Sequence, residues 1–379
     1  MKKEIKRVLS LTLIGLLIFP ALIVNAGNED RSGQAGAAEL LINPWAKGAG
    51  WGNVGIANAR GVEAMFLNVA GIAFTNKTQI AFMNTQWLKG SGTTVNSFGL
   101  TQRVGSTSVL GISVASMGFG DIQITTTENP GDDPNTGIGT FSPSFINVTV
   151  SYAKSFSDAI HGGFSVKLVN ESISDLNATG AAFDAGIQYV TGDYKNIRFG
   201  IALKNIGTPM SFGGDGYSIR GLVNGSENNQ TLEQRAAQFE LPSLLSIGGS
   251  YDFLWAKKAN NIAPDTTNKV KKSKLSYDNA QHRLTIAGNF ISNAFTKDQY
   301  ILGVEYSWNN MLQIRGGYNY ESDLTNEETN KTTFTGINFG ASIIAPLNKA
   351  KKSNFSIDYA YKSTRHFSGC HTIGATITL

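Results

Sequence analysis

The feature that most constrains this chain is a strict alternation of apolar and polar side chains, repeated in runs of about ten residues. In the run 280–293, Ile286 and Phe290 lie on one face, while Thr285 and Asn289 lie on the other. Successive side chains of a β-strand point to opposite faces of its sheet. The alternation therefore predicts strands whose two faces meet different surroundings.

About fourteen such runs follow one another, separated by turn-forming residues. They span 78–88, 93–103, 106–126, 143–156, 159–173, 179–192, 195–206, 242–256, 280–293, 297–308, 311–322, 333–345, 354–363 and 370–379. Bacterial transmembrane barrels have an even number of antiparallel strands, so that both ends of the sheet lie on one side of the membrane. The pattern predicts an all-β fold over residues 76–379, an antiparallel transmembrane β-barrel of about 14 strands in contact with outer-membrane lipid.

The composition agrees with a barrel. Charged residues make up only 16% of the chain, glycine reaches 42 and aromatic residues reach 10%. Soluble domains carry about a quarter charged residues. A barrel with lipid outside and a polar lumen needs fewer charged residues. The low charged fraction therefore favours a membrane barrel over a soluble protein.

The first 26 residues have the pattern of a secretory signal peptide. Lys2, Lys3 and Arg7 precede an apolar run, and Val24 and Ala26 stand where a cleavage site requires small or modest side chains. We expect residues 1–26 to be removed on export, and a retained membrane anchor is the less favoured alternative. Export and a barrel together predict the outer membrane of a Gram-negative bacterium.

Residues 27–75 precede the first strand and are predicted to form an N-terminal extension and a plug in or at the mouth of the barrel. The spacing of Val62, Met65, Phe66 and Val69 predicts one short helix over 61–70. Glycines allow close backbone approach, and tryptophans supply bulk between them. The candidate plug and lumen residues are Trp45, Gly48, Gly50, Trp51, Gly52, Asn68 and Gly71.

The connections between strands differ in length. Those expected to face the periplasm are tight, at 105, 157–158, 193–194 and 309–310, whereas the longest outward loops are 127–142 and 207–241. Two inward connections are instead basic. They carry Lys257, Lys258, Lys269, Lys271, Lys272, Lys274, Lys349, Lys351 and Lys352. These lysines are either solvated loop residues or a patch for an acidic partner or anionic headgroups.

Candidate chemistry is sparse. The four histidines lie on different predicted strands or their ends, and the single cysteine, Cys370, stands beside His371, where strand geometry sends the two side chains to opposite faces. We therefore predict no catalytic, metal or cofactor site and no enzyme activity. The net charge of +4 is too small to indicate a nucleic-acid partner.

Four segments resemble the PorV/PorQ family of outer-membrane proteins. The opening Pro44-Trp45-Ala46-Lys47-Gly48-Ala49-Gly50-Trp51-Gly52 is followed by Asn68-Val69-Ala70-Gly71-Ile72-Ala73, where the family has proline in place of Val69. Later segments are Asn205-Ile206-Gly207 and Leu241-Pro242 with Leu245 and Gly248. The family shares its barrel superfamily with FadL fatty-acid transporters, which implies fourteen strands and an N-terminal plug.

The resemblance implies a component of the type IX secretion system of Bacteroidota. Its partners would be the large translocon barrel and the C-terminal signal domains of cargo proteins, which it would shuttle to the attachment machinery. The outward loops 127–142 and 207–241 would contact cargo. Two alternatives remain open, a FadL-like transporter of hydrophobic small molecules and a structural barrel.

Overall fold

The computed structural model describes residues 27–127, 130, 138–223, 225, 228–255, 280–326, 328–348 and 353–379. The expected signal peptide, residues 1–26, lies outside the described residues. No helix in the described part of the chain is both long enough and apolar enough to cross a membrane.

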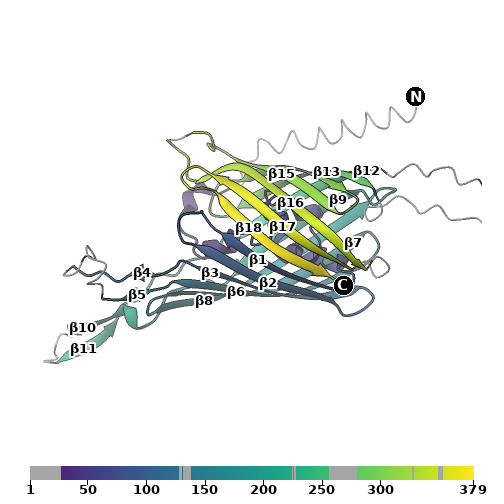
Figure 1. Cartoon of the computed structure of the whole chain (residues 1–379). Helices are drawn as coiled ribbons and strands as arrows, with labels where there is room; N and C mark the ends of the chain where they lie inside the picture. The colour runs from purple at the N-terminus through teal and green to yellow at the C-terminus, as the bar shows by residue number, and fades with distance from the viewer. Residues whose placement is uncertain are drawn as a thin grey trace, which may run out of the picture.

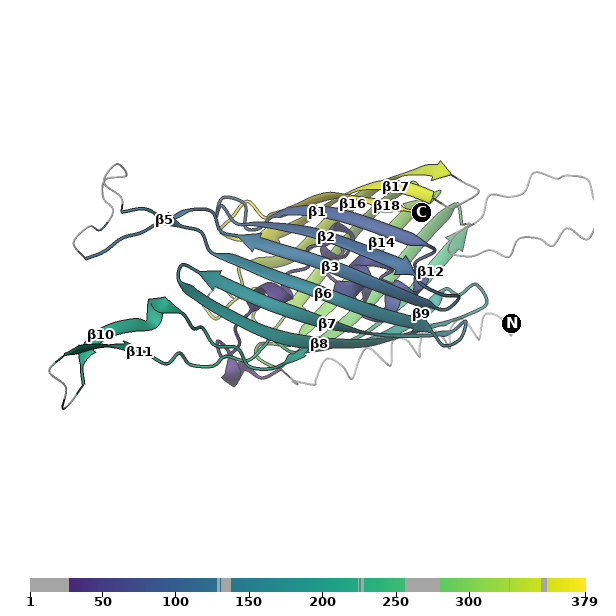
Figure 2. The same cartoon turned by 90° about the horizontal axis from the view of Figure 1, so that it is seen from below.

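The described strands form a closed antiparallel barrel of fourteen strands (Figures 1 and 2). Its strands are β1 (Thr78–Gln86), β2 (Thr94–Arg103), β3 (Ser108–Gly118), β6 (Ser144–Ser155), β7 (Ile160–Ile173), β8 (Leu176–Thr191), β9 (Ile197–Gly207), β12 (Leu244–Trp255), β13 (His282–Asn293), β14 (Gln299–Trp308), β15 (Leu312–Glu321), β16 (Phe334–Asn348), β17 (Ser353–Thr364) and β18 (Cys370–Thr378). Each overlaps one expected run, and the predicted fold class is confirmed.

The first and last strands close the barrel. Strand β1 pairs with β18 in antiparallel register from Gln79 opposite Thr378 to Gln86 opposite His371. Closure leaves no unpaired sheet edge, which is the condition for a β-sheet to span a membrane. We call the end where β1 begins and β18 ends the inner end, because bacterial barrels keep both termini in the periplasm.

The two faces of the wall differ as the alternation predicts. On β13 the side chain of Ile286 is 45% exposed and points outward, whereas Thr285 is 1% exposed and points into the lumen. The outward phase of the other strands repeats this pattern with large apolar residues such as Phe82, Leu302 and Ile343. The barrel therefore presents an apolar outer wall and a mostly polar inner wall, the arrangement of an outer-membrane protein.

Two small hairpins project beyond the outer end of the barrel (Figure 1). Strand β4 (Ile122–Gln123) pairs with β5 (Thr140–Phe141), and after the helical turn η7 (Asp215–Tyr217), β10 (Ser218–Leu222) pairs with β11 (Asn229–Glu233). The expectation of one strand over 106–126 was wrong. Strand β3 ends at Gly118 because Gly120 takes a φ of 76°, which interrupts an extended strand.

Short helical turns precede the barrel. The first lies at the outer end of the barrel, and those from Ala46 onward lie inside the ring of strands (Figure 2). The turns are η2 (Glu29–Arg31), η3 (Ala38–Leu41), α2 (Ala46–Ala49), η4 (Gly55–Ala57), η5 (Gly61–Glu63), α3 (Ala64–Leu67) and η6 (Val69–Phe74). The single helix expected over 61–70 is thus broken into three turns. Asn68 interrupts it with an extended backbone, and its side-chain oxygen accepts a hydrogen bond from the Ala70 amide at 3.2 Å.

Candidate functional site

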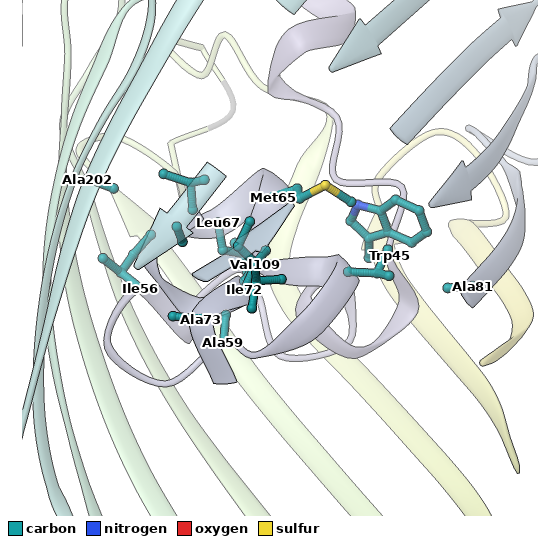
Figure 3. Close-up of a cluster of buried hydrophobic side chains, with 14 of the residues drawn as sticks. Trp45, Ile56, Ala59, Met65, Leu67, Ile72, Ala73, Ala81, Val109 and Ala202 are labelled. Atoms are coloured by element: carbon teal, nitrogen blue, oxygen red, sulfur yellow. The ribbon is translucent and has the colours of Figure 1, made fainter. Parts of the chain in front are cut away.

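The lumen contains a plug, which we define as residues 38–74. Its apolar side chains, among them Trp45, Ile56 and Leu67, form one buried cluster with small wall residues such as Ala81 and Ala202 (Figure 3). Small wall residues are needed here because a larger side chain would overlap the plug. The plug is therefore packed against the wall as a protein core is packed, without a solvent layer between the two in this cluster.

Glycines on several strands allow the plug backbone to touch the wall. A Cβ atom on Gly200 of β9 would overlap the carbonyl oxygen of Ile56, and one on Gly317 of β15 would overlap that of Trp51. A Cβ atom on Gly50 of the plug would lie 2.7 Å from the Cα atom of Gly340 on β16. The close approaches occur on three different strands, so they fix the plug from several sides.

The structure brings all seven candidate plug residues into the lumen. Trp45 and Trp51 are 3% and 7% exposed, and Asn68 is 1% exposed. Gly48 and Gly71 lie inside the plug, where a Cβ atom on Gly71 would overlap the carbonyl oxygen of Ala59. Gly50 and Gly52 face β15 and β16, and Gly52 has a φ of 69°, which favours glycine.

Asn68 links the plug to the wall by hydrogen bonds. Its side-chain nitrogen donates to the carbonyl oxygens of Ile56 in the plug at 2.9 Å and of Ile187 on β8 at 3.1 Å. Gly186 makes room for this side chain, because a Cβ atom there would overlap its amide oxygen. Asn68 thus caps η6 and fastens it to the wall.

The nine lysines of the candidate basic patch, in 257–274 and 349–352, lie outside the described residues.

A cavity of about 550 Å³ lies between the plug and the outer end of the barrel. Its wall is largely apolar, and the side chains that give this character include Ile42, Phe66, Met117, Phe119, Phe145, Leu244, Ile291 and Phe334. Four lysines also line it, namely Lys204, Lys297, Lys331 and Lys362. The volume and the mixture of apolar surface with a few charges suit a small ligand.

Lys204 is the most buried of these lysines, at 5% exposure. Its side-chain nitrogen lies 3.8 Å from the centre of the Phe66 ring. The π-electrons of the ring stabilise the charged form of the lysine. Among the described carboxylates, none forms an ion pair with Lys204. Its neighbour Lys167, by contrast, pairs with Asp184 at 2.6 Å. The Lys204 charge is therefore available to a ligand in the outer cavity.

Glu39 lines the same cavity from the plug. Burial, reinforced by the nearby carboxylate of Glu171, raises the pKa of Glu39 to about 8. Its carboxyl group is therefore mostly protonated at neutral pH. Glu39 therefore adds little negative charge to the cavity at neutral pH.

A second set of charges lies nearer the inner end of the lumen. Arg198 of β9 and Asp252 of β12 form a buried ion pair at 2.6 Å, and Asp252 accepts a hydrogen bond from Thr285 at 2.7 Å. Glu305 pairs with Arg283 at 2.9 Å and with Arg315 at 3.0 Å. These pairs join neighbouring strands across the lumen face and leave few charges unpaired in the described wall.

Sequence reasoning missed the roles of Lys204, Glu39 and the ion pairs. The signal was present in part, because Arg198 and Lys204 occupy the polar phase of a strand whose other phase is apolar. Within the described residues, no group of three or more His, Cys, Asp or Glu side chains is arranged to hold a metal ion. Cys370 is buried and His371 instead contacts Tyr359 at 2.8 Å, on different faces of β18.

A closed barrel with an apolar outer wall and a polar, plugged lumen is a multi-pass outer-membrane β-barrel of a Gram-negative bacterium. No protein-family model and no curated protein matches the chain. Among solved structures, the Pseudomonas putida toluene transporter TodX is similar, at 12% identity and a TM-score of 0.51, over 89% of this chain and 97% of that one.

A Pseudomonas aeruginosa FadL homologue is similar at 13% identity and a TM-score of 0.49, over 88% of this chain and 98% of that one. The likeness to TodX shows that the two proteins share a barrel fold. The resemblance to PorV/PorQ remains a prediction.

Proposed function

We propose that this barrel carries small hydrophobic molecules across the outer membrane. The observation that carries the proposal is the outer cavity of about 550 Å³, which lies between the plug and the outer end and has more apolar than polar surface. A polar solute would gain little from such a wall, whereas an apolar ligand would be transferred out of water. The fold shared with TodX, a toluene transporter, supports this class of cargo.

The lysines extend the proposal to molecules that carry an anionic group. Lys204 places a buried positive charge beside Phe66, so an apolar chain could lie against the ring while a carboxylate reaches the ammonium. A charge-assisted contact of this kind would orient the ligand in the cavity. Neutral hydrocarbons would use the apolar wall alone.

Uptake measurements test the proposal. Radiolabelled toluene and radiolabelled oleate would be offered to cells of a host that lacks its own transporter and expresses this protein. We expect uptake of at least one of them above cells carrying an empty vector. Equal uptake in both strains, with the folded barrel present in the membrane, would reject the transport proposal.

Lys204→Met separates the two ligand classes, because methionine keeps the apolar stem and removes the charge. We expect oleate uptake at low concentration to fall about tenfold, since a hydrogen bond to a charged group contributes about 1.5–3 kcal/mol. Toluene uptake should be unchanged. Lys331→Met is the matched control, because this lysine lines the same cavity but is exposed. An equal loss in both variants would reject a special role for Lys204.

We propose cargo handling in type IX secretion as a second candidate. The observation in its favour is the projecting hairpin β10–β11, where Ile219 and Leu222 are 54% and 66% exposed. Exposed apolar side chains outside the membrane are suited to a protein partner. A pull-down from solubilised membranes should then recover a translocon barrel or cargo signal domains, and deletion of 218–233 should abolish recovery. A pull-down without either partner would reject this candidate.

A further inference from the structure

The plug separates two cavities. The outer one, of about 550 Å³, opens among side chains at the outer end, such as Trp87 and Phe334. The other, of about 170 Å³, lies on the inner side and is lined by polar residues that include Glu63, Gln79 and Thr378. Neither Trp87 nor Phe334 lines the inner cavity. A solute crossing the barrel along its axis would have to pass from one cavity to the other.

Leu67 stands between them. Among the described residues, it is the one that lines both the outer and the inner cavity. It is 2% exposed and belongs to the buried cluster of the plug (Figure 3). Leu67 therefore contributes to the wall of both cavities.

The backbone of Leu67 is fixed by its neighbour Asn68, and the side chain of Leu67 packs against two glycines. Asn68, the next residue, is fastened to the wall through its hydrogen bond to Ile187. A Cβ atom on Gly48 or on Gly55 would lie 2.9 or 3.0 Å from the Cδ1 atom of Leu67. The side chain thus fits a notch between two residues that have no side chains of their own.

Parts of the plug edge are closed by backbone contacts with the wall. Gly200, Gly317 and Gly340 of the wall contact plug backbone directly, and backbone atoms cannot withdraw as a side chain can. A rotation of the Leu67 side chain needs no such movement. At these three positions a passage would require backbone movement, whereas at Leu67 it would require movement of one side chain.

We propose that Leu67 is the gate between the two cavities, and that its rotation opens an axial path through the plug. The proposal goes beyond the transport function, because it assigns the route and the residue that limits passage. It applies to any solute small enough to enter both cavities. Truncation of the side chain should join the cavities permanently.

The test is the permeability of proteoliposomes and planar bilayers that contain the purified full-length protein. Leu67→Ala should raise the swelling rate in arabinose and the conductance in potassium chloride by about tenfold, as expected when the barrier set by one side chain is removed. Ile72→Ala is the matched control, because Ile72 is an equally buried plug residue that lines neither cavity. It should leave both rates at the wild-type level.

Two outcomes would overturn the gate. One is a Leu67→Ala barrel, folded by the heat-modifiability criterion, that is no more permeable than the wild type. The other is an equal rise in Ile72→Ala, which would show general loosening of the plug. Because the solutes are hydrophilic, the gate can pass this test while hydrophobic uptake fails, and the reverse also holds. The two proposals can therefore fail separately.

A cysteine variant covers the case in which Leu67→Ala does not fold. Cys370 is the single cysteine of the chain, so Leu67→Cys in a Cys370→Ser background carries one thiol. We expect this variant to leak, and attachment of a benzyl group through benzyl methanethiosulfonate to restore closure. A leak unaffected by complete modification would reject Leu67 as the gate.

Discussion

Glu39 is a plug carboxyl group placed where water is scarce and a second carboxyl group is near. Its pKa is raised from 4.5 to about 8 by burial and by Glu171. A proton is then bound in the folded state over a pH range in which the unfolded chain has lost it. Folding stability therefore decreases as the pH rises between these two values.

Glu39→Gln should remove the contribution of Glu39 to this dependence, because the amide cannot ionise. The wild-type unfolding temperature in detergent should fall as the pH rises from about 4.5 to about 8, and the variant should show a flatter profile over that range. Glu240→Gln is the control, since Glu240 is exposed and pairs with Arg31 at 2.6 Å. Parallel profiles for the wild type and Glu39→Gln would contradict the assignment.

Strand β9 meets the plug through a residue without a side chain. Gly200→Ala should push Ile56 away from the wall, because the added methyl group meets a carbonyl oxygen that cannot withdraw on its own. We expect the free energy of unfolding to fall by about 1–3 kcal/mol. Thermal or urea unfolding measures the loss.

Gly288→Ala on β13 is the matched control for that substitution. A Cβ atom there would lie 3.4 Å from Leu302 on the neighbouring strand, which is an ordinary contact. This variant should unfold like the wild type. If Gly288→Ala is destabilised as much as Gly200→Ala, the loss belongs to strand backbone entropy and not to the plug.

The elements show which parts of the fold a single sequence can predict. Strands were predicted closely because lipid and lumen impose opposite demands on alternate residues, as at Ile286 and Thr285. The helix over 61–70 was predicted as continuous because its apolar spacing is helical throughout. The interruption at Asn68 is accompanied by a hydrogen bond from its side chain to the carbonyl oxygen of Ile187, a residue distant in sequence. No local pattern records that contact.

The candidate site was predictable only as a region. The glycines and tryptophans of the N-terminal segment indicated close packing, and the structure places them in the lumen. The ion pair of Arg198 and Asp252 could not be predicted from the sequence. It forms because β9 pairs with β12, while the chain between these two strands forms a separate hairpin outside the barrel wall. The role of Leu67 likewise follows from the shapes of two cavities, which exist only after closure.

At the scale of the whole molecule, the lipid-facing wall is open to a direct test. Ile286→Arg should impair assembly and cost about 2–4 kcal/mol if the residue lies near the middle of the bilayer. Heat-modifiable gel migration and unfolding from lipid vesicles measure the effect. Ile286→Leu should behave like the wild type.

Thr285 provides the comparison on the lumen face of the same strand. The structure limits the substitutions that this residue should tolerate. The hydroxyl group donates to Asp252 at 2.7 Å, so only a substitution that keeps it, such as Thr285→Ser, should be neutral. Equal damage from Thr285→Ser and Ile286→Arg would contradict the assignment of the two faces.

The seam between β1 and β18 also bears on the order of assembly. The plug lies inside a ring with no free edge, so it either is in place before the two strands join or enters through an end of the barrel. Residues 38–74 immediately precede β1, and they can collapse onto the growing sheet while it is still open. If the plug instead followed β18 in the sequence, it would be synthesised last. It would then have to enter a barrel whose strands were already available to pair.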